Sequence, residues 1–351
     1  MGRWIKRLAA ALAVLVVLVF AAAWLSPWPG VLVIRQIFDA GARAASAKLE
    51  KHLPANVRSL NDIAYAPGDP DARLDIHLPS SGKGPFPVIL WIHGGAWVSG
   101  DKSDLTNYLK ILAARGYSVV NIGYSIAPGA TYPTPVRQAN AALGFVVREG
   151  ARYGLDPTRI VLAGDSAGAQ LAVQLAGIVT SADYADAVGI TPSPLPAPLR
   201  GVLLYCGPYD VGKVNFDGPF GTFLHTVVWA YSGSRDFRSD PAFALMSVAQ
   251  HVTPAFPPAF ISVGNADPLR PQSVQLAEAL RAKGGKVETL FFPDAYTPPL
   301  AHEYQFDLDT AAGQLALRRS AAWLGGVMRD APPQQPAEQA DSPRAAESGH
   351  K

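Results

Sequence analysis

The hydrophobic and polar positions along the chain change their period several times, and each change predicts a different element. Residues 8–25 form an uncharged apolar run, and from 31 to 53 apolar residues recur at three- and four-residue steps, which is typical of an amphipathic helix. Residues 58–65 and 72–78 alternate apolar and polar, as half-buried strands do. Residues 88–92 are continuously apolar, which indicates a buried strand.

From that strand onward, strand-like and helix-like segments alternate. Apolar runs predict further strands at 117–122, 159–163, 199–206, 259–263 and 287–292, and amphipathic runs predict helices at 104–115, 135–149, 167–180, 271–283 and 311–328. Apolar strands separated by helices indicate a mostly parallel sheet with helices on both faces. Because the two alternating strands open the series as an antiparallel pair, we expect an α/β fold with a mixed sheet of eight strands.

Two segments interrupt the alternation. Residues 181–198 are rich in proline and alanine, and we interpret them as a connection. Residues 207–258 form a long insertion with large aromatic residues, among them Phe216, Phe220, Phe223, Trp229, Tyr231 and Phe243. Long insertions inside a compact domain are often functional, so we predict a lid or cap. The alternative for most of these aromatics is that they pack a small core of the insertion itself.

The N-terminus predicts a membrane-directed segment. Three basic residues precede the apolar run, tryptophans flank it, and 18 apolar residues span about 27 Å as a helix, close to the thickness of a bilayer core. The basic flank predicts a cytoplasmic N-terminus, so residues 1–25 would anchor an extracytoplasmic domain. A signal peptide cleaved after the alanines at 21–23, which would leave a secreted or periplasmic protein, is the alternative.

The rest of the domain organisation follows from composition. Residues 26–57 are expected to form an amphipathic helical linker or cap, and residues 58–329 the catalytic domain. Residues 330–351 contain no large apolar side chain and are expected to be disordered. A net charge of +2 argues against a nucleic-acid partner, and the single cysteine, Cys206, excludes an internal disulfide. The oligomeric state is not indicated.

The segment Gly164-Asp-Ser-Ala-Gly168 carries the candidate chemistry. It lies between a predicted strand and a predicted helix, where a serine on a sharp turn projects its hydroxyl beyond the sheet as a nucleophile elbow. The two glycines suit a turn that a side chain would crowd. Ser166 is therefore the candidate nucleophile.

A serine nucleophile needs a base and a group that orients the base, and the strand order locates both. In the Ser–acid–His order of the α/β-hydrolase scaffold the base follows the last strand, and His302 is the candidate there. Asp267 follows the preceding strand and is the candidate acid, with a helix N-cap as its structural alternative. Asp294 and Glu303 are weaker candidates for the acid.

Oxyanion donors are expected in the turn that follows the strand at 88–92. The segment His93-Gly-Gly-Ala-Trp97 is rich in small residues, which let backbone N–H groups approach a substrate oxygen. We predict an oxyanion hole formed by the N–H groups of Gly95, Ala96 and Ala167, with Gly94 as a further possible donor. Trp97 and Asp165 are predicted to contact substrate, and His93 is expected to hold the loop.

Together these motifs resemble a known family. The segments 93–97, 124–128 and 154–168, with the strand at 74–79, are similar to the HGG-type α/β-hydrolases, which include the hormone-sensitive-lipase-like carboxylesterases and the acetyl- and feruloyl-esterase-like group. The resemblance runs from about residue 60 to residue 324. It implies hydrolysis of a small-molecule ester through an acyl-enzyme, without a metal or organic cofactor, in a site covered by the N-terminal helix and the insertion.

The chain also departs from that family pattern. Glu303 stands where a small residue usually follows the histidine, Ala169-Gln170 replaces Gly-Asn, and Ala96-Trp97 makes an HGG-x-W motif that also occurs in kynurenine-formamidase-like enzymes. The leading interpretation is a serine carboxylesterase for uncharged esters. An aryl-formamidase or small-amide hydrolase is the alternative, and a hydrolase-like binding module without catalysis is the third.

Overall fold

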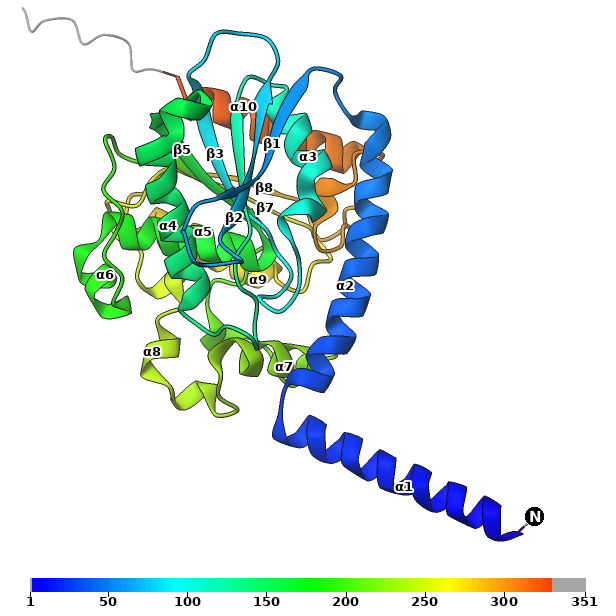
Figure 1. The fold of residues 1–351 in the computed structure, drawn as a ribbon. Coiled ribbons are helices and arrows are strands. Elements are labelled where there is room, and N and C mark those ends of the chain that lie inside the picture. Colours follow the sequence, from blue (N-terminus) through cyan, green and yellow to red (C-terminus); the bar gives the residue numbers. More distant parts are fainter. Residues whose placement is uncertain (1, 330–351) are drawn as a thin grey trace, which may run out of the picture.

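A central sheet organises the computed structural model, which describes residues 2–329 (Figure 1). The disordered tail predicted at 330–351 lies outside the described residues. The strands are β1 (Val57–Ala64), β2 (Arg73–Pro79), β3 (Phe86–Ile92), β4 (Ser118–Ile122), β5 (Leu155–Asp165), β6 (Gly201–Tyr205), β7 (Ala259–Val263) and β8 (Val287–Phe291).

The strand order is β1-β2-β4-β3-β5-β6-β7-β8 in one eight-stranded sheet. β2 runs antiparallel to both β1 and β4, and all other neighbours are parallel. The predicted mixed, mostly parallel sheet of eight strands is thereby confirmed. Since β3 to β8 run in one direction, their carboxyl ends share one edge, where open α/β sheets build their sites.

Helices cover both faces of this sheet and extend beyond it. They are α1 (Gly2–Leu25), α2 (Trp28–Leu49), α3 (Thr106–Ala113), α4 (Thr134–Glu149), α5 (Ser166–Thr180), α6 (Ala182–Val188), α7 (Gly221–Ser232), α8 (Pro241–Ala244), α9 (Arg270–Ala282) and α10 (Ala311–Val327). Residues 102–105, at the start of the predicted helix 104–115, form a 3₁₀ turn ahead of α3.

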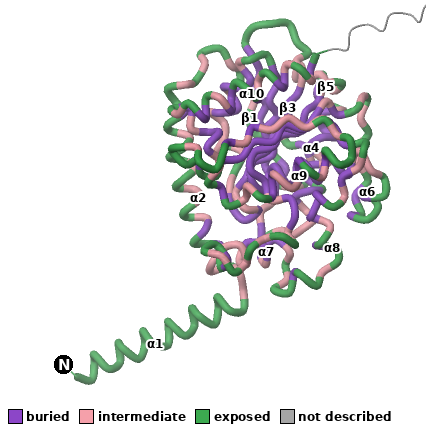
Figure 2. Tube along the Cα trace, turned by 180° about the vertical axis from the view of Figure 1, so that it is seen from behind, coloured by how far each residue is buried: buried purple, intermediate pink, exposed green. Residues whose placement is uncertain are grey.

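The core lies on the two faces of the sheet. Alternate residues of β3 belong to different apolar clusters: Leu90 packs with residues of α4, α5 and α9, whereas Trp91 packs with residues of α3 and α10. This alternation follows from the two-residue period of a strand. Figure 2 shows the buried residues gathered in the centre of the domain, with α1 exposed along its whole length.

One predicted connection contains a helix. Within residues 181–198, for which no helix was predicted, α6 forms. Ser181 caps it by accepting a hydrogen bond from the Tyr184 amide, and Gly189 ends it in the left-handed conformation. The helix is short and buries Tyr184 and Val188, so capping and burial rather than a long apolar repeat account for it.

Helix α2 lies along the side of the domain, and its first half reaches the carboxyl edge of the sheet (Figure 1). The Arg35 guanidinium donates to the carbonyls of Val98 and Ala127, in the loops that follow β3 and β4. Beyond the helix, Lys51 forms an ion pair with Asp309. Both ends of this segment are therefore fixed to the domain.

Candidate active site

The serine lies on a tightly packed elbow between β5 and α5. Ser166 is the first residue of α5 and has a φ of +49°, a left-handed conformation that is strained for a residue with a side chain. A Cβ atom on Gly168 would stand 2.0 Å from the Ile92 carbonyl oxygen, and one on Gly164 would stand 2.5 Å from the Gly168 carbonyl carbon. Both glycines are thus required because backbone approaches them closely.

Ser166, His302 and Asp267 form one chain of hydrogen bonds. His302 Nε2 lies 3.0 Å from Ser166 Oγ, and His302 Nδ1 lies 2.8 Å from Asp267 Oδ2. Each residue follows a strand: β5 ends before Ser166, β7 precedes Asp267 and β8 precedes His302. Parallel strands bring these positions to one edge, so residues up to 136 positions apart in the chain meet.

The two weaker candidates for the acid lie elsewhere. Asp294 forms an ion pair with Arg270 and its side chain is 86% exposed. Glu303 Oε1 lies 3.8 Å from His302 Nε2, the nitrogen that faces the serine rather than the one that faces Asp267. Glu303 has a φ of +60°, another left-handed residue beside the site. It therefore adds a negative charge on the serine side of the imidazole.

The surroundings of His302 favour its charged form. Burial alone would lower the pKa of His302, but its interactions with Cys206, Asp267 and Glu303 outweigh burial and raise that pKa well above 6.5. Burial raises the pKa of the neighbouring Cys206 thiol to about 11, so the thiol is neutral at neutral pH. The carboxylates of Asp267 and Glu303 are then the charges that stabilise the imidazolium.

The turn after β3 presents free backbone donors. Gly95, Ala96 and Trp97 have φ values of +103°, +54° and +59°, and a Cβ atom on Gly95 would stand 2.1 Å from the Ser99 carbonyl oxygen. The N–H groups of Gly95 and Ala96 have no hydrogen-bond acceptor among residues 2–329. Ala167 lies in the first turn of α5, where an N–H lacks an intrahelical acceptor.

The structure argues against two of the sequence-based expectations here. The Gly94 N–H donates to Asp165 Oδ2 at 2.9 Å, so it is not a free oxyanion donor. Asp165 is buried, and its other carboxylate oxygen accepts from the Trp91 indole at 2.8 Å. Asp165 therefore ties the elbow to the turn after β3, and its buried carboxylate is held by Trp91 and Gly94.

Trp97 is also engaged inside the protein. Its ring stacks on Tyr231 of α7 at 4.8 Å, nearly parallel, and its indole N–H donates to Gln170. Its predicted contact with substrate is therefore limited to the apolar ring. His93 stacks on Tyr124, whose hydroxyl donates to the His93 carbonyl, so it lies in the loop framework as expected.

Two residues near the site were not singled out from the sequence as contributors to it. Arg35 holds the Val98 carbonyl, next to the oxyanion turn, and an arginine in an otherwise apolar helical stretch was its only signal. Cys206 was considered as a cysteine without a disulfide partner; it is buried and lies against His302. Its position directly after β6, at the carboxyl edge, was the available signal.

One group of side chains near the site has the residue types of metal ligands. Cys206, Asp267 and His302 offer donor atoms that all lie within 4.8 Å of one another. The His302 and Asp267 atoms among them are already hydrogen-bonded to each other. A metal ion at this position would have to displace the hydrogen-bond chain that ends at Ser166.

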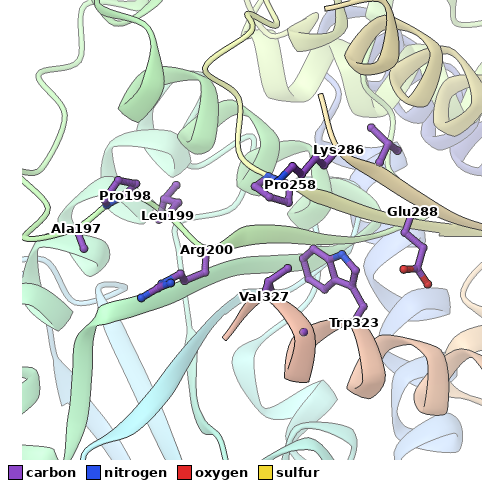
Figure 3. A pocket seen from close by; sticks show the side chains of 11 residues that line it. Ala197, Pro198, Leu199, Arg200, Pro258, Lys286, Glu288, Trp323 and Val327 are labelled. Atoms are coloured by element: carbon purple, nitrogen blue, oxygen red, sulfur yellow. The ribbon is translucent and has the colours of Figure 1, made fainter. Parts of the chain in front are cut away.

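A separate cavity of about 760 Å³ lies at the opposite edge of the sheet (Figure 3). It is lined by Arg200, Pro258 and Lys286, which directly precede β6, β7 and β8, and by Trp323 of α10. These positions are the amino ends of strands whose carboxyl ends carry the candidate site. The cavity is therefore not a route to Ser166.

A strand–serine–helix elbow followed along the chain by an acid and a histidine, on a sheet of this order, defines the α/β-hydrolase class. Within that class the chain can be assigned to a family. The BD-FAE family model matches residues 74–280, and the chain belongs to this family.

Curated relatives and solved structures agree with this assignment. An esterase of Gibberella moniliformis is 30% identical over 212 residues, which cover 57% of this chain and 63% of that protein. Esterase LipQ of Mycobacterium tuberculosis is 29% identical over 287 residues, 79% of this chain and 65% of that protein. The chain thus spans somewhat less than two thirds of the length of these relatives.

Among solved structures, esterase B from Lactobacillus rhamnosis is similar in fold. It superposes with a TM-score of 0.71 at 24% identity, covering 85% of this chain and 96% of that one. At this identity the similarity supports the fold, and the expected α/β-hydrolase architecture is confirmed.

Proposed function

We propose that this protein is a serine carboxylesterase that hydrolyses uncharged carboxylic esters through an acyl-enzyme at Ser166. The observation that carries the proposal is the hydrogen-bond chain from Ser166 through His302 to Asp267, on a strained elbow beside free backbone donors. Relatives named as esterases support the same reaction.

The geometry supports a distinct catalytic role for each of these residues. In the neutral form of His302, the Nδ1–H donates to Asp267, and Nε2 is unprotonated and able to accept the Ser166 hydroxyl proton. As that proton leaves, Oγ forms a bond to the acyl carbon, and the N–H groups of Gly95, Ala96 and Ala167 stabilise the oxyanion. His302 then returns the proton to the departing alkoxide. Water releases the acyl group by the same steps.

The cap favours an uncharged substrate. Residues 207–258 bring Tyr231 onto Trp97, and Tyr231 and Phe243 pack edge-on against Tyr132. An aromatic cover packed on the turn after β3 suits apolar acyl or aryl groups, and Glu303 disfavours an anionic group near the serine. We therefore assign residues 207–258 as a cap over a catalytic domain that spans 58–329.

We further propose that α1 is a membrane anchor and that the catalytic domain lies outside the cytoplasm. α1 is 24 residues long, buries no residue, and is long and apolar enough to cross a bilayer. A signal peptide meets the same criteria. Membrane fractionation with intact-mass measurement separates the two: an anchor keeps residues 1–25 in the membrane pellet, and cleavage yields a shorter soluble protein.

The test of the reaction is turnover of a p-nitrophenyl ester series from acetate upward, measured beside p-nitroacetanilide and N-formylkynurenine. We expect ester hydrolysis whose rate depends on acyl length and is lost in Ser166→Ala. Faster turnover of the amide or formamide would identify the amide hydrolase instead. Absence of turnover of all three classes by the wild type would identify a binding module.

A further inference from the structure

The exposed apolar side chains of the described residues are concentrated in one region. Outside α1, the large exposed hydrophobic residues between positions 26 and 329 are Trp28, Leu32, Val33, Ile37, Leu53 and Phe220. Four of these six lie within the first ten residues of α2, and Val33 and Ile37 are 60% and 63% exposed. Single exposed apolar residues are ordinary on a protein surface, but a cluster marks an interaction site.

We define the α2 apolar face as Trp28, Leu32, Val33 and Ile37. Its exposure does not come from a loosely attached helix, because the opposite side of the same turns is docked. Val31 and Ile34 are buried, and the Phe38 ring contacts Phe223 of α7 at 5.7 Å. Arg35 is hydrogen-bonded to two loop carbonyls of the domain.

This face lies on the same side of the molecule as the candidate active site. The turns that carry it also carry Arg35, which reaches the loop after the oxyanion turn. Its neighbour α7 carries Tyr231, which stacks on Trp97 of that turn. Figure 1 shows α1 leaving from this end, beside α7. Phe220, directly before α7, adds a side chain that is 56% exposed.

The junction with α1 indicates what covers this face. Only two residues, Ser26 and Pro27, separate α1 from α2, so the apolar surface of α1 continues into the α2 apolar face. Arg235 fixes this junction: its guanidinium lies over the Trp24 and Trp229 rings and donates to the Trp24 carbonyl. Tryptophan and arginine next to an apolar helix are typical of a membrane–water interface.

We propose that the α2 apolar face and Phe220 are seated in the interfacial layer of a lipid bilayer, so that the cap and active site face the membrane and take lipophilic esters from it. The inference rests on the proposed function, namely esterase activity and anchoring by α1. A surface helix of this kind buries its apolar side about 5–10 Å into the headgroup boundary. A second copy of the chain is the competing occupant, but it would not account for the continuity with α1.

The location of the face can be measured without catalysis. In the full chain reconstituted in phosphatidylcholine–phosphatidylglycerol vesicles, Val33→Cys is labelled with the environment-sensitive dye NBD, and Leu53→Cys is the matched control at the far end of the same segment. The single native cysteine is buried, so labelling is selective. We expect a blue shift and at least threefold stronger quenching by spin-labelled lipids at position 33.

Equal quenching at positions 33 and 53 would overturn the proposal. Self-quenching between labelled copies, with no quenching by lipid, would assign the face to a second copy of the chain and would overturn it as well. Because this readout requires no substrate, it decides the surface even if the esterase function fails.

The consequence for substrate access is tested with two esters in the same vesicles. The double variant Leu32→Glu/Ile37→Glu is expected to hydrolyse soluble p-nitrophenyl acetate at a rate within twofold of wild type. Its rate on 4-methylumbelliferyl palmitate dissolved in the bilayer is expected to fall at least tenfold. Leu53→Glu is expected to retain both rates. An unchanged ratio of the two rates in the double variant would overturn the proposal. Absence of turnover of both esters by the wild type would instead refute the esterase function.

Discussion

The elbow helix α5 and the N-terminal helix α2 are both rich in apolar residues, but they place those residues differently. Thirteen of the 15 residues of α5 are buried, whereas α2 buries Val31, Ile34 and Leu49 and leaves Val33 and Ile37 exposed. An apolar helical pattern therefore predicts the helix but not what covers it. In α5 the cover is the protein's own core, and in α2 we infer that part of the cover is lipid.

In the buried region around α5, the largest loss of activity is expected from a substitution of the candidate acid. Asp267→Asn is expected to reduce kcat by about 10⁴-fold, because the amide NH2 of asparagine can donate to Nδ1 and so favour the tautomer with the proton on Nε2, which cannot accept the Ser166 proton. Ester turnover at saturating substrate measures it. The matched control is Asp294→Asn, since Asp294 is exposed and pairs with Arg270; a similar loss there would make Asp294 the acid.

The packing of the elbow is expected to tolerate no added atom. Gly168→Ala would place its Cβ 2.0 Å from the Ile92 carbonyl oxygen, and we expect the free energy of unfolding to fall by about 4 kcal/mol or more. Urea unfolding measures the change. Gly326→Ala in α10 is the control, because its Cβ would meet nothing within 4 Å and the substitution should stabilise by up to about 1 kcal/mol. Equal stability of both variants would contradict the described elbow.

The connection between the two regions is Arg35. Arg35→Ala removes the donors to the Val98 and Ala127 carbonyls, and we expect about a tenfold loss in kcat/KM as the oxyanion turn loses its support. Steady-state kinetics on a soluble ester measures the loss. Arg43→Ala, an exposed arginine of the same helix, should leave activity unchanged. If Arg35→Ala were equally active, α2 would have no part in positioning that turn.

The smallest expected effect is a shift in the pH profile. His302 must be neutral to act as a base, and its raised pKa means that activity is lost on acidification at a higher pH than an ordinary histidine would give. Asp267, Glu303, Cys206 and Asp165 are the titratable groups around it. Glu303→Gln removes one charge that favours the imidazolium, so the acidic limb of kcat/KM should move to lower pH by up to about one unit. A limb that stayed in place would show that Glu303 does not act on His302.

Much of this architecture could be predicted from the sequence, because local patterns determine it. Alternating or continuously apolar residues indicate each of the eight strands. Amphipathic runs between the strands indicate most of the helices. Positions beyond the carboxyl ends of strands, such as Ser166, Asp267 and His302, follow from the same patterns. The catalytic roles of these residues and the domain assignments stay predictions.

What could not be predicted depends on contacts between distant segments. The two hydrogen bonds that occupy Asp165 come from Trp91 and Gly94, more than 70 residues away. Arg35 and Val98 are likewise 63 residues apart. The local periodicity of the sequence carries no information about contacts between such distant residues. The helix α6 was missed for a different reason, since a seven-residue helix offers too short a repeat to detect.

The central claim is that Ser166 is the nucleophile of a hydrolase, and covalent labelling tests it most directly. Incubation of the full chain with a fluorophosphonate ester, followed by peptide mass spectrometry, should give one adduct per chain on Ser166 with parallel loss of ester turnover. Ser166→Ala should be neither labelled nor active. An adduct on another residue that abolishes turnover, or wild-type ester hydrolysis by Ser166→Ala, would contradict the claim.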